Sequence, residues 1–338
     1  MRRLFAAILL AAGVGTFTAP AARAKTPQGN DPSLPQIWLI AVGPEWRQAR
    51  GWEPNDYMDL FSSQQAWSGA LTHVQVFGIS KRSVMTAPDQ ELAAIIAGLR
   101  RDHVALAMQV TPLIASRKCG LGVEGHGPRS DMLTAARRIS GLGGTVQYAF
   151  MDEPLWYGHD YNARRGRAGV PCHSSIAEVA QETAAKVADI RSVFPGVKVG
   201  DVEPVGVSPP NGEDWGSQLA EWVRAYQTAT GEPLGFLHVD CVWFRPNWQP
   251  QLEQAAQVAR AAGIPLGIIY NASPREADNV SWTATAVSHF RYIEGQLRIV
   301  PQQAIFQTWT YFPTRVLPPS QPGTLSYVVA QYLAWRGL

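Results

Sequence analysis

Three acidic side chains, Glu153, Glu203 and Asp240, lie at or near the ends of short apolar runs in the chain. Removing carboxylates from water costs several kcal/mol unless they are paired or used. Paired carboxylates support general acid and base chemistry. One protonated acid donates to a leaving oxygen, while a second carboxylate attacks or activates water. These residue types therefore indicate hydrolysis of a glycosidic bond.

Polar and aromatic side chains occur at similar positions along the chain. Aromatic rings offer an apolar face with a polar handle, which suits stacking on a sugar ring. Tyr157 is one such ring. We expect the following residues to bind substrate: Asp152, Trp156, His238, Tyr270, Asn271, Gln307, Trp309 and Tyr311.

Eight short apolar or β-rich runs, bounded by Gly, Pro or polar residues, are typical of buried parallel strands. They are 36–42, 73–79, 104–110, 146–151, 197–202, 234–242, 266–270 and 304–309. Between them, apolar residues recur at helical spacing. The expected helices include 90–101, 176–193, 219–226, 252–262, 284–297 and 327–335.

This eightfold strand–helix alternation predicts a single (β/α)8 TIM barrel over residues 36–338. An open doubly wound sheet is the alternative, but no G-x-G-x-x-G follows the first run. Active sites of such barrels lie at the carboxyl ends of the strands.

Strand alternation predicts which side chains reach the lumen. In the fourth strand the bulky Tyr148 and Phe150 are expected to pack under helices, which sends Met151 and Glu153 inward. In the fifth, Asp201 and Glu203 share one face. The mouth of the barrel is then expected to collect Glu153, Glu203, His238 and Asp240.

Met151-Asp152-Glu153-Pro154 resembles the Asn-Glu-Pro signature of the large clan of retaining (β/α)8 glycoside hydrolases. The resemblance implies that Glu153 is the acid/base. Thr308-Trp309 at the end of the eighth strand is similar to the clan's sugar-stacking tryptophan, which implies that role for Trp309. The implied architecture covers the chain from residue 36 onward.

The chain departs from the clan's pattern at two places. Asp152 replaces the expected Asn, and the seventh strand ends in Tyr270-Asn271-Ala272, where the clan carries its nucleophilic Glu. The second carboxylate is therefore Glu203 or Asp240. The adjacent-strand pair with Glu203 suits the ~5 Å separation of retention, and the pair with Asp240 suits the ~6.5–9.5 Å of inversion.

Three other interpretations remain open. The barrel is a carbohydrate-binding protein without catalysis, or a metal-dependent non-glycosidic hydrolase or lyase whose ligands are Glu153, Glu203, His238 and Asp240. No ligand spacing identifies a metal site, so neither metal nor cofactor is expected. In the third interpretation, loop cations merely neutralise the carboxylates, with candidates Arg117, Lys118, Arg164, Arg165 and Arg275.

Residues 1–24 have the layout of a secretory signal peptide: Arg2 and Arg3, an apolar stretch and an A-x-A site ending at Ala24. Residues 25–35 form a polar lead-in. Removing Arg2, Arg3 and Arg23 changes the net charge from +2 to −1, which argues against nucleic acid or membrane partners. We expect a secreted or periplasmic bacterial protein with a carbohydrate substrate.

Two long loops, 111–129 and 154–174, follow the third and fourth strands. Cys119 and Cys172 lie in these loops, so we expect them to form a disulfide, with Cys241 reduced in an apolar strand. The glycine-rich stretch 120–127 is expected to form a rim that presents Glu124 or His126 to substrate.

Overall fold

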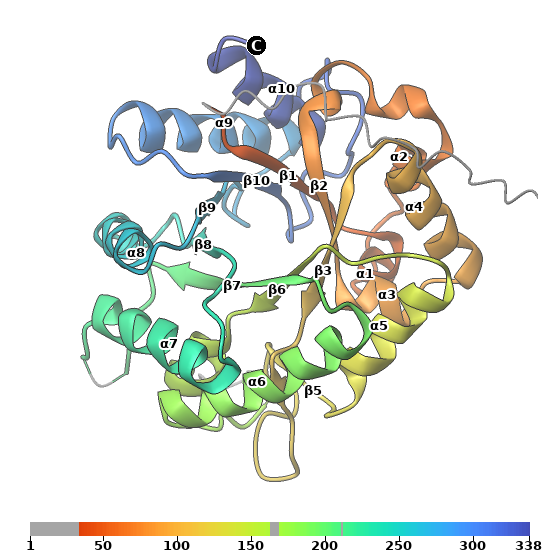
Figure 1. Cartoon of the computed structure of the whole chain (residues 1–338). Coiled ribbons are helices and arrows are strands. Elements are labelled where there is room, and N and C mark those ends of the chain that lie inside the picture. The colour runs from red at the N-terminus through yellow and green to blue at the C-terminus, as the bar shows by residue number, and fades with distance from the viewer. Residues whose placement is uncertain (1–33, 163–168, 211) are drawn as a thin grey trace, which may run out of the picture. The chain divides into compact units, whose positions relative to one another are not determined.

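The computed structural model describes residues 34–162, 169–210 and 212–338. The predicted signal peptide, most of the lead-in, Arg164 and Arg165 lie outside the described residues. Eight parallel strands close into a barrel in the order β1-β2-β3-β6-β7-β8-β9-β10 (Figure 1). Their bounds are β1 Gln36–Ile40, β2 Val74–Ile79, β3 Ala105–Val110, β6 Tyr148–Asp152, β7 Lys198–Val205, β8 Leu237–Cys241, β9 Leu266–Ile269 and β10 Gln303–Gln307.

This barrel confirms the predicted (β/α)8 fold. Helices surround the strands (Figure 1). The helices are α1 Pro44–Ala49, α2 Asp59–Ser62, α3 Lys81–Thr86, α4 Asp89–Arg101, α5 Asp131–Gly141, α6 Ile176–Val193, α7 Trp215–Thr230, α8 Trp248–Ala262, α9 Asn279–Gly295 and α10 Leu325–Trp335. The short turns are η1 Gln64–Trp67, η2 Gly69–His73 and the π-helix η3 Trp156–Asp160.

Local sequence explains where the longer helices begin and end. A capping box of Ser175 and Glu178 opens α6, and the Asp214 side chain accepts from an amide at the start of α7. Gly231 and Gly263 end α7 and α8 with φ of 76° and 66°, a conformation that glycine adopts without strain.

The core has two parts. The larger part fills the layer between strands and helices. The smaller part fills the lumen, where the amino-terminal half is closed by a cluster that we call the aromatic floor: Trp38, Tyr148, Phe236 and His238. The ring centroid of Trp38 lies 5.0 Å from that of Tyr148 and 4.9 Å from that of His238.

Two strand glycines make room for the aromatic floor. A Cβ on Gly200 would lie 2.2 Å from the Phe236 ring, and a Cβ on Gly267 would lie 2.3 Å from the His238 ring. Glycine inside a strand commonly marks such a close approach. Gly200 and Gly267 therefore face the lumen.

The predicted alternation was wrong by one residue in β6. Tyr148 and Phe150 face the lumen, while Ala149 and Met151 pack in the outer layer. The prediction assumed that large residues pack under helices, but here large rings fill the barrel itself. Asp152 therefore continues the lumen-facing row.

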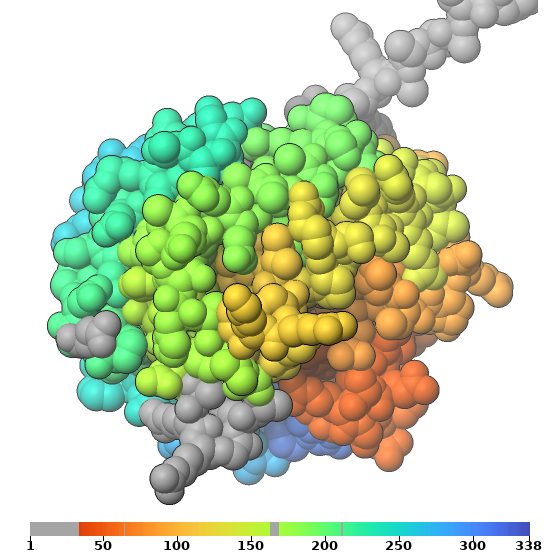
Figure 2. Space-filling model, turned by 90° about the horizontal axis from the view of Figure 1, so that it is seen from below, coloured from red at the N-terminus to blue at the C-terminus, as the bar shows by residue number. Residues whose placement is uncertain are grey.

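The loop after β3 contains a two-stranded pair, β4 (Leu113–Ile114) with β5 (His126–Gly127). The predicted disulfide between Cys119 and Cys172 is confirmed, with a Cα–Cα distance of 5.0 Å, and Cys241 is a buried free thiol. The space-filling view shows the gold loop after β3 beside the yellow-green segment that leads into α6 (Figure 2). Across the described parts of the chain, no helix combines the length and apolarity needed to cross a membrane.

Candidate active site at the barrel mouth

The carboxyl ends of the strands form a mouth that brings four carboxylates within electrostatic reach of one another. Asp152 ends β6, Glu153 follows it, Asp240 lies near the end of β8, and Glu124 comes from the loop after β3. Like charges in a partly dry site disfavour ionisation. The mouth is therefore built to hold protons on some of its acids at neutral pH.

Asp240 has the most polar support. Asn271 Nδ2 donates to its Oδ1 at 2.9 Å, and the Trp309 indole also donates to its carboxylate. Asn271 is oriented by Trp243, whose Nε1 donates to Asn271 Oδ1 at 2.6 Å. Burial raises the pKa of Asp240, these hydrogen bonds oppose it, and the result is about 6. Asp240 is therefore mainly ionised at neutral pH.

Asp152 holds its proton more tightly. Burial, followed by the charge of Glu124, raises its pKa to about 8, while a hydrogen bond from Gln109 and the charge of Lys81 oppose the increase. Asp152 is therefore mainly protonated where Asp240 is ionised. Environments that separate two carboxyl pKa values in this way distinguish an acid from a base.

Lys81 is a cation at the mouth, and a buried ion-pair network holds it there. Its Nζ lies 2.8 Å from Asp131 Oδ2 and 3.1 Å from Thr111 Oγ1. Lys186, which is 1% exposed, pairs with the other oxygen of Asp131. A Cβ on Gly127 would clash with Asp131 at 2.1 Å, so the loop backbone packs tightly against this network.

Glu153 has an unusual backbone. Its φ is 50°, a left-handed conformation that costs a non-glycine residue ~1–3 kcal/mol and that clusters at functional sites. Its amide donates to Val202 O at 3.0 Å, which ties the strained residue to β7. Burial, followed by the charges of Asp152 and Glu124, raises its pKa well above the ordinary value. Glu153 is therefore a second protonated acid at the mouth.

Glu124 and Tyr157 join the two long loops across the mouth. The Tyr157 hydroxyl donates to Glu124 Oε2 at 2.9 Å. Burial and the nearby carboxylates Glu153 and Glu124 raise the pKa of Tyr157, so it remains a donor. Glu124 was expected at the rim, and the structure places it there.

Glu203 does not open into the mouth, which corrects the expected alternation. It is 0% exposed, and its oxygens accept from the amides of Leu155 at 2.6 Å and Trp156 at 3.1 Å. Asp201, on the same outer face, accepts from Trp222 of α7 at 2.6 Å. With Gly200 and Val202 directed into the lumen, both acids must point toward the helices.

Two predicted substrate-binding residues also lie elsewhere. His238 belongs to the aromatic floor, where its Nε2 lies 2.6 Å from Gln303 Oε1, and burial lowers its pKa to about 4. Tyr270 is buried in the outer layer, and its hydroxyl donates to Glu294 of α9. Neither side chain reaches the mouth.

The remaining candidates lie at the carboxyl end of the barrel. Trp309 is 43% exposed and Tyr311 is 38% exposed, the latter beside Trp52 and the Arg47 guanidinium. Gln307 ends β10 on the lumen-facing row of Gln303 and Ile305. Trp156 is half-buried at the start of η3.

The proposed metal ligands do not converge. Glu203 points outward, and His238 lies in the floor, where its Nε2 is paired with Gln303 Oε1. Over the described ranges, no three His, Cys, Asp or Glu side chains are grouped so as to hold a metal ion. Among the loop cations suggested as neutralising groups, Arg117 and Lys118 are exposed and Arg275 stacks on Phe244.

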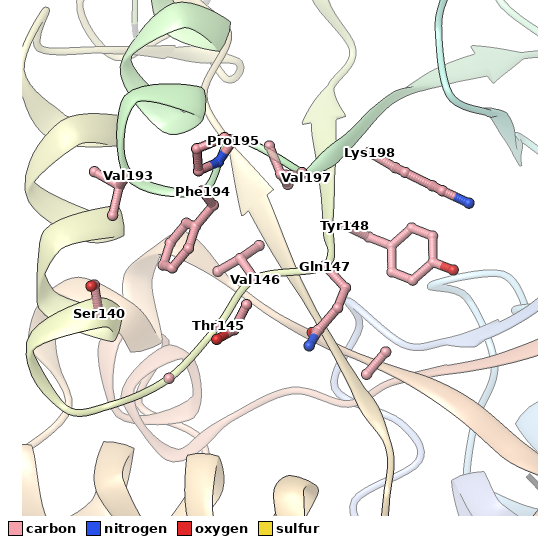
Figure 3. A pocket seen from close by; sticks show the side chains of 13 residues that line it. Ser140, Thr145, Val146, Gln147, Tyr148, Val193, Phe194, Pro195, Val197 and Lys198 are labelled. Carbon is pink, nitrogen blue, oxygen red and sulfur yellow. The ribbon is translucent and has the colours of Figure 1, made fainter. Parts of the chain in front are cut away.

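Two cavities lie at different ends of the barrel. One of about 610 Å³ is lined by the beginnings of β6 and β7, with Tyr148 and Lys198 at its edge (Figure 3). Its lining includes no carboxylate. The other, of about 560 Å³, is a groove beside the mouth over the ends of β6, β7 and β8. Only the second lies next to acid/base chemistry.

Sequence reasoning missed Lys81, Gln109 and Trp243. Lys81 lies two positions after the end of β2, so its place after a strand was a signal. Gln109 is a polar residue in an otherwise apolar strand, which also marks a lumen position near the mouth. Nothing in the sequence indicated that the Trp243 ring would stack on His289, with centroids 3.6 Å apart.

Comparisons with known proteins identify the fold alone. No family model matches the chain, and no curated protein matches it. The solved structures with similar folds include the catalytic core of xylanase A, with 10% identity, a TM-score of 0.52 and coverage of 89% of this chain and 98% of that one.

A xylanase A variant from P. fluorescens subsp. cellulosa in complex with xylopentaose has 9% identity and a TM-score of 0.51, over 89% of this chain and 98% of that one. The carboxyl transferase domain of Rhizobium etli pyruvate carboxylase with 3-bromopyruvate has 10% identity and the same TM-score, over 89% of this chain. This chain spans 47% of that carboxylase structure. Glycosidic and non-glycosidic barrels therefore resemble this chain equally well.

Proposed function

We propose that this protein is a glycoside hydrolase or transglycosylase whose active site is the barrel mouth. The observation that supports it best is the pair of lumen-facing carboxyls, Asp152 and Asp240, beside the exposed Trp309 that donates to Asp240. The site offers a protonated acid, an ionised carboxylate and an aromatic face in one place. Glycosidic bond cleavage uses the two carboxyl groups as acid and as nucleophile or base, and the aromatic face suits stacking on a sugar ring.

Each side chain has a distinct role in this proposal. Glu153 donates a proton to the leaving glycosidic oxygen, in keeping with its raised pKa and its position after β6. Asp240, ionised and oriented by Asn271, attacks the anomeric carbon or activates water. Asp152, protonated, donates a hydrogen bond to a sugar hydroxyl and keeps the charge of the mouth low.

Of the two candidates for the second carboxylate, Glu203 and Asp240, this proposal takes Asp240. Both oxygens of Glu203 are already occupied by the amides of Leu155 and Trp156. Glu203 instead fixes the segment that follows Glu153. We therefore assign it a positioning role.

The disulfide supports export to an oxidising compartment, because such bonds persist there and are rare in reducing ones. We propose that the substrate is an extracellular or periplasmic carbohydrate.

The test is hydrolysis of a panel of polysaccharides, including β-1,4-xylan, β-1,3- and β-1,4-glucans, chitin and chitosan. Release of reducing ends by the wild type and not by Asp240→Asn supports the proposal. Binding without release by the wild type would instead favour a non-catalytic carbohydrate-binding barrel. That second candidate is favoured by one observation: Asn271 stands where the resembling clan carries its nucleophile.

A further inference from the structure

A groove of about 560 Å³ extends beside the mouth, over the carboxyl ends of β6, β7 and β8. This volume is typical of ligand sites, which span ~300–1,000 Å³. The η3 segment forms one wall, and the residues after β8 form another. Its aromatic and charged lining residues are Trp156, Tyr157, Asp160, Tyr161, Phe244 and Arg245.

The groove is continuous with the mouth through Tyr157. The Tyr157 ring lines the groove, while its hydroxyl binds Glu124, whose charge raises the pKa of both Asp152 and Glu153. The neighbouring lining residue, Trp156, is held by its backbone amide, which donates to Glu203. The wall of the groove is thus anchored by a buried carboxylate next to the proposed acid.

Asp160 supplies a polar group with an unmet hydrogen bond in this lining. The residue is 2% exposed, and its Oδ1 accepts from Gln218 Nε2 at 3.0 Å. Its Oδ2 is buried and has no partner among the described residues. A buried acceptor left unpaired costs ~1–3 kcal/mol, so such an atom needs an explanation.

The backbone here is also specialised. Asp160 ends η3, a single-turn π-helix, and such turns are frequent at functional sites. Tyr161 packs against the rings of Tyr157 and Trp156, with centroids 5.2 Å and 6.4 Å away. Across the groove, Phe244 is 43% exposed and is braced by the Arg275 guanidinium at 4.3 Å.

We propose that this groove binds additional sugar units of the chain that is cleaved at the mouth, so that the substrate is a polysaccharide. The inference rests on the proposed function and extends it. The aromatic walls provide faces for sugar rings, and Asp160 adds to the same lining a carboxyl group with one oxygen that no described residue satisfies.

The experiment compares wild type, Asp160→Asn and Phe244→Ala on oligomers of increasing length, prepared from whichever polysaccharide of the panel is cleaved. We expect wild-type kcat/KM to rise with chain length. Each variant should show a deficit that grows with length and reaches about tenfold, which corresponds to one interaction of ~1.4 kcal/mol. Val300→Ala, an exposed residue just before β10 at the other end of the barrel, is the matched control and should behave as wild type.

A kcat/KM that does not depend on chain length, or a deficit of equal size at every length, would overturn the groove assignment while leaving the proposed activity intact. If no polysaccharide is cleaved, the proposed function fails, and affinity electrophoresis in gels containing each polysaccharide decides the groove separately. Retardation of wild type and Val300→Ala that is weakened in both groove variants would support it. Absence of retardation in every gel would overturn it.

Discussion

Asn271 Nδ2 donates a hydrogen bond of 2.9 Å to Asp240 Oδ1, and Asn271 Oδ1 accepts one from Trp243 Nε1. Because an indole N–H can only donate, Trp243 fixes which end of the Asn271 amide faces Asp240. The seventh barrel strand thus supports a carboxylate on the sixth.

Asn271→Ala should shift the acidic limb of the pH–rate profile upward by about one unit, because a hydrogen bond to a carboxylate is worth ~1.5–3 kcal/mol. The hydrogen bond lowers the pKa of Asp240, so its loss raises that pKa. Trp309→Phe removes the other donor and should shift the limb in the same direction. An acidic limb that is unchanged in both variants would show that the ionisation of Asp240 does not control the rate.

Glu153→Gln should keep the fold and ligand binding but lower kcat by roughly 10²–10⁴-fold, which is the usual contribution of a general acid. The loss should be smaller for aryl glycosides whose leaving group needs no protonation. Glu203→Gln is the comparison: it disturbs the amide contacts of Leu155 and Trp156, so its loss should not depend on the leaving group. Wild-type turnover of a natural substrate by Glu153→Gln would contradict its assignment as the acid.

Asp152→Asn should stabilise the folded protein at neutral pH. The pKa of Asp152 is about 8 in the folded chain and ~3.9 when unfolded, so ionisation in the unfolded state costs native stability as pH rises between these values. The Tm advantage of the variant should therefore be absent below pH 4, grow through pH 5–7 and level off above pH 8. Thermal scans across this range would show it, and a constant Tm difference would refute it.

Lys81→Met should move the alkaline limb of the pH–rate profile to higher pH. The ammonium of Lys81 lowers the pKa of Asp152, so without it Asp152 stays protonated to a higher pH. Lys186→Met is a matched control, because it removes the buried ion pair with Asp131 but keeps the ammonium of Lys81. We expect that variant to lose Tm without moving the alkaline limb.

Thiol titration of the denatured, unreduced protein should detect one free cysteine per chain, Cys241. Replacing Cys119 and Cys172 with Ser should lower the stability by ~2–4 kcal/mol, since the bond closes a loop with a sequence separation of 53. Three titratable thiols in protein purified from an oxidising compartment would contradict the pairing.

The barrel itself was predictable from the sequence because its eight strands are short apolar runs that alternate with helical patterns, and α6 was predicted with its observed bounds, Ile176–Val193. The disulfide was predictable because both cysteines lie in loops that leave neighbouring strands. The sequence analysis did not predict correctly which side chains of β6 face the lumen and which face the helices, because large residues occupy both faces of this strand.

The sequence of β7 contained a better indication of which side chains face the lumen. Gly200 interrupts an apolar strand, and a strand glycine indicates that another side chain approaches it closely. Taking Gly200 as lumen-facing would have directed Asp201 and Glu203 outward and Asp152 inward. Lys81 and Asp160 were harder to predict, because their roles depend on contacts with Asp131 and Gln218, more than 45 positions away in the sequence.

The aromatic floor has a consequence for how protons and water reach the site. Trp38, Tyr148 and Phe236 fill the lumen beneath the carboxylates, so solvent reaches Asp152 and Asp240 from the open end. A long substrate lying across that end would therefore isolate the acids from bulk solvent during turnover. The acid that gives a proton to the departing sugar must then regain one from the water molecule, or from the acceptor hydroxyl, that completes the same reaction cycle.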